Sequence, residues 1–220
     1  MEITVDIIII QYSRKMQDTI DYFRDYSFSI MGYLDSDYQK KLLTAREHFS
    51  KEIYGVNKVS AICLHNGVMY RVLDKGLVHD CFLSNKADLL ILSPVYGVVH
   101  AFEKIRVYRV VNEARYIRAW IHIGIDKIVS NYIGNRRPRR IYGFFPATSP
   151  YIEVFKSIVK RLRHTMSYLV TVDVCRGGYG FMVSRALGNA INHLLRRGYI
   201  PSSIDECILA RESIVKNSST

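Results

Sequence analysis

The sequence predicts an α/β fold, a single domain in which helices flank a mostly parallel or mixed sheet. Apolar, β-branched runs of strand length recur at residues 3–10, 59–64, 89–92, 140–145 and 168–174. Amphipathic segments of helix length lie between most of these runs. With no linker or internal repeat in the alternation, residues 1–220 are expected to form one domain with a polar tail from about 212 to 220.

The two clearest strands are each followed by a polar loop. Residues 3–10 are rich in β-branched side chains and are predicted to form a central strand, and residues 11–15 follow it as a candidate edge of a site. Residues 89–92 lack polar alternation, as a strand buried on both faces does, and Pro94 predicts its end. The charged segment after Tyr96 is a second candidate, because open α/β sheets bind ligands in such loops.

Apolar spacing predicts the helices. We expect them over residues 38–54, 68–77, 114–133, 151–163 and 181–197. The stripe at 114–133 predicts one continuous helix, and Ser149-Pro150 is a typical start for the helix that follows. Residues 16–30 show only weak helical spacing, and a short helix is expected near residues 203–210.

Composition favours an anionic partner. The 31 Lys and Arg against 20 Asp and Glu give a net charge of +11, and such an excess favours an anionic partner, most often nucleic acid, or else a nucleotide or a membrane surface. A hydrophobic content of 49% excludes a disordered chain. The apolar stretches are too short and too interrupted to cross a bilayer, and Glu2 and Asp6 are unlike a signal peptide, so a cytoplasmic protein without a membrane partner is expected.

The four cysteines are scattered and predict reduced thiols. Cys63, Cys81, Cys175 and Cys207 form no C-x-x-C pair. Cys63-x-His65 and His79-x-Cys81 have no familiar zinc spacing, so core cysteines are the preferred interpretation, and no metal or cofactor is predicted. Cys175 alone stands near a predicted helix start, where a lowered thiol pKa is expected.

Two arginine-rich segments predict a phosphate-binding surface. The first follows the helix at 114–133, and the second lies on the outer face of the helix at 151–163. The predicted nucleic-acid contacts are Arg136, Arg137, Arg139, Arg140, Lys160, Arg161 and Arg163. Such contacts bind through salt-dependent attraction without sequence preference. The alternative is a basic face that is only solvated.

A cleft for a nucleotide-like small molecule is the other candidate site. Glu103 is the predicted acid or base, although a lone carboxylate there is more often a partner for an arginine. The glycine turn at residues 176–180 precedes a helix and offers backbone N–H groups to an anion, or is simply a tight turn. The predicted ligand-binding residues are Ser93, Tyr96, Gly97, Tyr108, Arg109, Arg176, Gly178, Gly180 and Arg185.

Several segments follow one another in a recognisable order. They are Asn66-Gly67-Val68-Met69-Tyr70 with Gly76-Leu77, Leu92-Ser93-Pro94-Val95-Tyr96-Gly97-Val98-Val99-His100, Tyr108-Arg109, Trp120, Ser149-Pro150-Tyr151 and Gly180-Phe181-Met182 with Ser184-Arg185. Together these segments resemble the YaaA family of peroxide-stress proteins. The resemblance covers about residues 60–200. It implies an α/β domain with a positively charged cleft, in a cytoplasmic protein that binds DNA and limits oxidative damage.

Three functions follow as hypotheses. The first is a DNA-binding protein of YaaA type that binds the phosphates of double-stranded or branched DNA through the predicted nucleic-acid contacts named above. The second is an enzyme that acts on a nucleotide, nucleoside or nucleic-acid base in the cleft around Ser93–Arg109 and residues 176–180. The third is a protein-binding module with an incidental basic face, which a flat surface without a pocket would favour. The sequence predicts no oligomeric state.

Overall fold

The α/β fold predicted from the sequence is confirmed by the computed structural model, which describes residues 5–18, 20–162, 165–176 and 180–214. In sheet order, the seven strands of the main sheet are β4 (Gly97–His100), β3 (Ala87–Ser93), β1 (Asp6–Gln11), β6 (Arg140–Phe144), β7 (Met166–Cys175), β9 (Cys207–Ser213) and β8 (Ser203–Ile204). A separate pair joins β2 (Val59–Ser60) to β5 (Lys104–Ile105). In the described part of the chain, no helix is both long and apolar enough to span a bilayer.

The predicted central strand is confirmed as β1. It runs parallel to β3 on one side and to β6 on the other, and its four isoleucines, Ile7 to Ile10, are all buried. β7 extends the parallel set next to β6, whereas β4 and β9 run antiparallel to their neighbours and make the sheet mixed. A strand with partners on both sides and apolar layers on both faces needs this unbroken apolar run.

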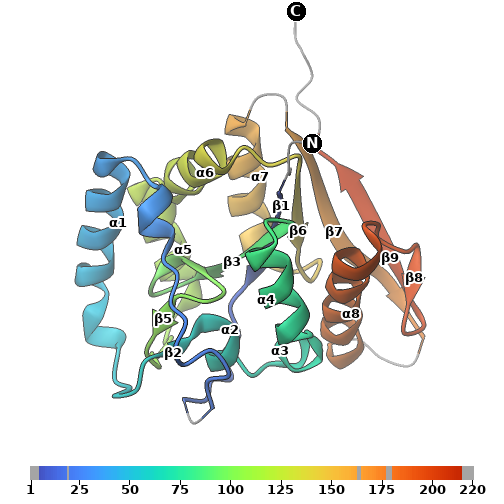
Figure 1. Cartoon of the computed structure of the whole chain (residues 1–220), viewed down its shortest axis with the longest axis horizontal. Helices are drawn as coiled ribbons and strands as arrows, with labels where there is room; N and C mark the ends of the chain where they lie inside the picture. The colour runs from blue at the N-terminus through green and yellow to red at the C-terminus, as the bar shows by residue number, and fades with distance from the viewer. Residues whose placement is uncertain (1–4, 19, 163–164, 177–179, 215–220) are drawn as a thin grey trace, which may run out of the picture.

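Helices cover both faces of the sheet. The α-helices are α1 (Ser36–His48), α2 (Ala61–Leu64), α3 (Val68–Val72), α4 (Lys75–Leu83), α5 (Glu113–Ile123), α6 (Ile125–Arg136), α7 (Tyr151–Arg161) and α8 (Phe181–Arg197), and the short 3-10 helices are Ile30–Tyr33 and Ser50–Glu52. Figure 1 shows α3, α4 and α8 together on one side of the sheet, and α5, α6 and α7 together on the other. α1 packs outside α6.

Two predicted elements were wrong in type. Residues 59–64 were predicted as a strand, but only Val59 and Ser60 pair with β5, and the rest form α2. All six residues are buried, and an unbroken apolar run of this length does not distinguish a short helix from a strand. Residues 203–210 were predicted as a helix but form the hairpin of β8 and β9, in which buried Cys207 and Leu209 alternate with exposed neighbours.

Other predicted boundaries moved for local reasons. The helix predicted at 114–133 is broken at Gly124, whose φ of +89° lies in the left-handed region, and so becomes α5 and α6. The helix predicted at 38–54 ends at His48, and the weak spacing at 16–30 gives no α-helix among the described residues there. Gly97 does turn the chain as predicted, but the segment after it is the buried strand β4 rather than a loop.

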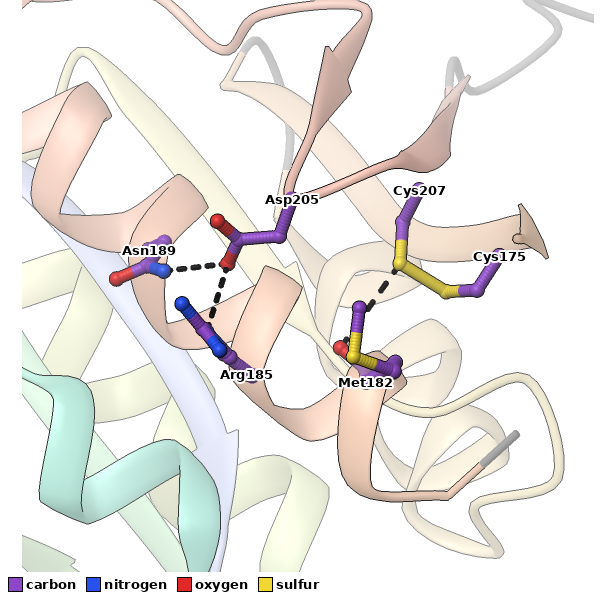
Figure 2. Close-up of a disulfide and its surroundings, with 6 residues drawn as sticks. All are labelled: Cys175, Met182, Arg185, Asn189, Asp205 and Cys207. Carbon is purple, nitrogen blue, oxygen red and sulfur yellow. Dashed lines mark hydrogen bonds and ion pairs between the residues drawn. A yellow bond between two sulfur atoms is a disulfide. The ribbon is translucent and has the colours of Figure 1, made fainter. Parts of the chain in front are cut away.

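The prediction of four reduced cysteines was wrong for two of them. Cys175 and Cys207 are paired across β7 and β9 and form a disulfide (Figure 2). Cys63 and Cys81 are free and buried. The expected lowered thiol pKa of Cys175 therefore does not apply. The two cysteines are 32 residues apart and lie on neighbouring strands, so the spacing of cysteines in the sequence gives no sign that they pair.

Candidate functional site

The chain leaves β1 and β6 in opposite directions. From β1 it re-enters the sheet at β3, on one side, and from β6 it re-enters at β7, on the other. In an open α/β sheet such a divergence leaves a crevice at the carboxyl ends of the two strands, and ligands bind there. The topology therefore points to the ends of β1 and β6.

A cavity of about 230 Å³ lies at this place and is named here the carboxyl-edge cavity. Residues 11–14 at the end of β1 and residues 67–70 at the start of α3 form much of its wall, and Glu113, Pro146 and Ser184 complete the lining. The sequence points to residues 11–15 as a candidate site edge, and the wall that follows β1 comes from that loop.

Close packing holds this loop against the start of α3. A β-carbon at Gly67 would come within 3.0 Å of the Ser13 β-carbon, so only glycine allows the two segments to approach so closely. The Ser13 N–H lies 3.3 Å from His65 Nδ1, and the Asn66 N–H donates to the Lys15 carbonyl at 2.8 Å. These contacts fix the position of the wall.

A layer of buried aromatic side chains lies next to the cavity. Tyr12 is at its centre, with ring centroids 6.2 Å from His65, 6.3 Å from Tyr108 and 6.1 Å from Tyr151. The Tyr70 hydroxyl, by contrast, donates to the Gln11 carbonyl at 2.7 Å. Tyrosine and histidine here combine apolar packing with polar atoms that need partners.

Three of these polar atoms have no partner among the described residues: the hydroxyls of Tyr12 and Tyr151 and the Nε2 atom of His65. Burial raises the pKa of Tyr12 to about 12, with the nearby Arg14 acting in the opposite direction. Burial also lowers the pKa of His65 to about 4. At neutral pH this layer is therefore uncharged, and each unpartnered atom costs folding free energy of about 1–3 kcal/mol unless water or a ligand reaches it.

One ion pair stands at the rim of the cavity. Arg14 Nη2 lies 2.8 Å from Glu113 Oε2, and the Arg14 side chain is 73% exposed. Glu113 is in the first turn of α5, where a carboxylate interacts favourably with the helix dipole, and Asn112 caps the same helix by accepting from the Arg115 N–H. The charges of the pair cancel at the entrance.

The residues predicted to form the small-molecule cleft lie in several places. Ser93 and Tyr108 are buried and joined to each other at 3.0 Å, and the Tyr96 hydroxyl accepts from the Arg106 N–H at 3.1 Å. Gly97 packs against Trp120, which would lie 2.7 Å from a β-carbon there. Arg109 is exposed. None of the described residues of this set lines the carboxyl-edge cavity.

Glu103, the predicted acid or base, is held by an arginine. Its Oε1 atom lies 2.6 Å from Arg46 Nη1, and its side chain is 9% exposed. Arg46 also donates to the carbonyls of Tyr96 and Val98. The ion pair and these hydrogen bonds hold α1 against β4 and the turn before it. The arrangement matches the structural alternative that the sequence left open for a lone carboxylate.

The glycine turn of residues 176–180 is described only at its ends, because Gly178 and its two neighbours lie outside the described residues. Arg176 is exposed, and Gly180 precedes α8 with a φ of +83°. Arg185, one turn into α8, points to Asp205 of the β8–β9 turn, with Nε 3.5 Å from the carboxylate, and Asn189 donates to the same carboxylate (Figure 2). Arg185 thus joins α8 to the hairpin.

A second hollow lies beside the other end of the sheet, where β6 begins. It has a volume of about 890 Å³ and lies along α6, beside the end of α7; it is named here the amino-edge groove. Lys127, Arg137 and Arg161 line it, together with polar side chains that include Asn131 and Thr165. Two of the predicted nucleic-acid contacts, from separate arginine-rich segments, thus line one groove.

The other predicted contacts differ in how much of their charge is neutralised. Arg136 binds the fully buried Asp88 at 2.7 Å, and Arg140 binds Asp6 at 2.6 Å. Arg139 is half exposed and lies 3.7 Å from the same Asp6. Lys160 is exposed, Arg161 pairs with Asp126, and Arg163 lies outside the described residues.

Sequence reasoning predicted one member of the aromatic layer, Tyr108, as a ligand-binding residue but missed its grouping with Tyr12, His65 and Tyr151. These four residues come from four segments that are far apart in the chain, and besides Tyr108 only the polar loop after β1 had a signal of its own. Within the described ranges, no group of three or more His, Cys, Asp and Glu residues could hold a metal ion. In comparisons with known proteins, neither a protein-family model nor a curated protein matches this sequence.

Proposed function

We propose that this chain binds DNA, in double-stranded or branched form, through the amino-edge groove, as a protein of YaaA type that protects DNA or limits oxidative damage. The observation that carries the proposal is the convergence of Lys127, Arg137 and Arg161 on one open groove. The net charge of +11 supports it, because long-range attraction brings a polyanion to a basic surface. The YaaA role itself rests on the resemblance of the sequence segments.

The groove suits a phosphate backbone better than a compact anion. Its volume of about 890 Å³ is open, and its cations come from two helix ends and the link between α6 and β6 rather than from one loop. Asp126 compensates Arg161 in part, which leaves Lys127 and Arg137 as the cations with no ion-pair partner among the described residues. Contacts of this kind position a duplex without reading its sequence.

A salt titration tests the proposal. Binding of a labelled duplex and of a four-way junction is measured by fluorescence anisotropy from about 50 to 200 mM salt, where phosphate contacts weaken affinity steeply. Lys127→Ala with Arg137→Gly removes two cations, and glycine keeps the left-handed backbone of position 137 (φ +48°). Each lost phosphate contact lowers the slope of log K against log salt by about 0.9, so the double variant should lose about 1.8.

A matched double variant provides the control. Lys58→Ala with Arg118→Ala removes the same charge from two exposed positions that do not line the groove, and it should leave the slope unchanged. The proposal is contradicted if neither DNA binds at about 50 mM salt, or if both double variants lower the slope equally. The second result would indicate attraction by overall charge alone.

A further inference from the structure

The carboxyl-edge cavity takes no part in the proposed DNA contact, because it lies at the other end of the strands. Of its eleven lining residues only Arg14 and Glu113 are charged, and they form an ion pair with each other. A phosphate or carboxylate ligand would therefore meet no uncompensated cation in the lining. The charge balance favours a ligand that is polar but uncharged.

A buried polar atom in the wall has no partner. Tyr12 lines the cavity and is 5% exposed, and its buried hydroxyl lies near the Arg14 and Glu113 side chains but makes no hydrogen bond to a described residue. Since a buried hydroxyl is normally satisfied, a ligand or water atom that reached it from the cavity would supply the missing partner. The Ser13 and Ser184 side chains lie in the same lining, and the Gln11 amide oxygen accepts from the Ser149 hydroxyl, which orients the amide NH₂ as a further donor.

The size and the apolar walls narrow the class of ligand. A volume of about 230 Å³ is below the roughly 300–1,000 Å³ of pockets that take drug-sized molecules, so it suits a single ring system. Val68, Met69 and Pro146 add apolar surface next to the Tyr70 ring. Apolar side chains combined with hydrogen-bonding groups in one lining fit a ring that has an apolar face and donors and acceptors around it.

We propose that the carboxyl-edge cavity binds a small uncharged heterocycle of the nucleobase class, with the Tyr12 hydroxyl and the Ser184 side chain contacting its polar edge. The ring lies against Met69 and Pro146, and the Arg14–Glu113 pair borders the entrance. Free bases and nucleosides share this chemistry, whereas a nucleoside monophosphate adds a charge that the lining does not neutralise.

Calorimetric titration with named probes tests this assignment. The probes are uracil, cytosine and hypoxanthine, then uridine, cytidine and inosine, and finally the three corresponding 5′-monophosphates. At least one uncharged probe should bind, and its monophosphate should bind no more tightly. Tyr12→Phe should weaken binding about fivefold through the loss of one hydrogen bond, while Tyr54→Phe, at a 68% exposed position, should have no effect.

A second variant keeps the test decisive if Tyr12→Phe disturbs the fold. Ser184→Leu adds side-chain volume to the cavity from the rigid helix α8 and should abolish binding while thermal unfolding stays cooperative. The proposal is overturned if no uncharged probe binds at 1 mM, or if both variants bind as the unaltered chain does. DNA affinity of the same variants is measured in parallel, and it should not change, so that a failure of this inference is distinguishable from a failure of the DNA proposal.

Discussion

Buried polar side chains have different partners at the two ends of the parallel strands. At the amino ends, aspartates face arginines: Asp88 meets Arg136 at 2.7 Å, and Asp6 meets Arg140 at 2.6 Å. At the carboxyl ends, the buried polar groups are phenols and an imidazole, and three of their atoms have no partner among the described residues. The buried carboxylates of one end are paired with arginines, whereas the buried polar groups of the other end are uncharged and partly without partners.

This difference separates buried groups that stabilise the fold from buried groups that are left without a partner. A buried ion pair with all its hydrogen bonds made is costly to break, because the remaining charge is left without compensation. An unpartnered buried hydroxyl costs folding free energy and is available to a ligand. The amino ends are therefore expected to tolerate few substitutions inside the ion pairs, and the carboxyl ends to tolerate the loss of a polar atom.

The largest expected change in the free energy of unfolding is for a substitution of Asp88. This carboxylate accepts from Arg136 through both oxygens and from the Tyr132 hydroxyl at 2.8 Å, and it is fully buried. Asp88→Ala should lower the free energy of unfolding by about 3–5 kcal/mol, as measured by urea denaturation. Glu47→Ala, which removes an exposed acid, is the control and should change it by no more than about 0.5 kcal/mol. A loss below about 1 kcal/mol for Asp88→Ala would contradict the description of the amino ends.

Acidification should destabilise the chain through its buried histidines. Burial lowers the pKa of His65 to about 4 and that of His100 to about 3, below the value of about 6.5 in the unfolded chain. Below pH 6.5 the unfolded state therefore binds more protons than the folded state. The free energy of unfolding decreases as the pH is lowered through that range. Between pH 7 and pH 5 the expected loss is about 2 kcal/mol for each histidine.

Urea titrations at the two pH values measure this loss. His100 lies among Phe28, Phe82 and Phe102, so His100→Phe keeps an aromatic ring there and removes one of the two titrating groups, together with the acceptor of the Phe102 N–H. The difference between pH 7 and pH 5 should fall by about half in this variant. An unchanged difference would assign the acid sensitivity to other groups.

The smallest expected change in the free energy of unfolding is for a substitution of Tyr12. Its hydroxyl makes no hydrogen bond to a described residue, so Tyr12→Phe removes an unsatisfied group without breaking a contact. The free energy of unfolding should stay within about 1 kcal/mol of the unaltered chain or rise. Thermal and urea unfolding both measure it, and a loss above about 2 kcal/mol would mean that an internal water or a polar contact holds this hydroxyl in the native state.

The sequence predicts most of the sheet and little of the site. The strands β1, β3, β6 and β7 were predicted because buried parallel strands are continuous apolar runs, and α8 begins and ends where its stripe does. The β8–β9 hairpin was missed because its turn uses Asp205 and Glu206 at positive φ, positions where glycine or asparagine would have given a signal.

The site depends on proximity that no local pattern contains. Residues 11–15 were predicted as a site edge, but Tyr12 meets His65 and Tyr151 only after the sheet and α7 have formed. Glu103 was chosen as an acid or base for its place after a strand, and its partner Arg46 lies on a helix more than fifty residues earlier. The arginine-rich segments were the exception, because their charge is visible in the sequence, although Asp6 and Asp88 as partners were not.

The central position of β1 has a consequence for how the chain is made. Its isoleucines are synthesised before their partner strands, which begin at Ala87 and Arg140. At roughly 5–20 residues per second, the second partner follows on the order of ten seconds later. During that delay a four-isoleucine strand has both hydrogen-bonding edges open, which is a typical site for misassociation. Production of this protein should therefore depend on chaperone supply and expression temperature more than the stability of the finished fold would suggest.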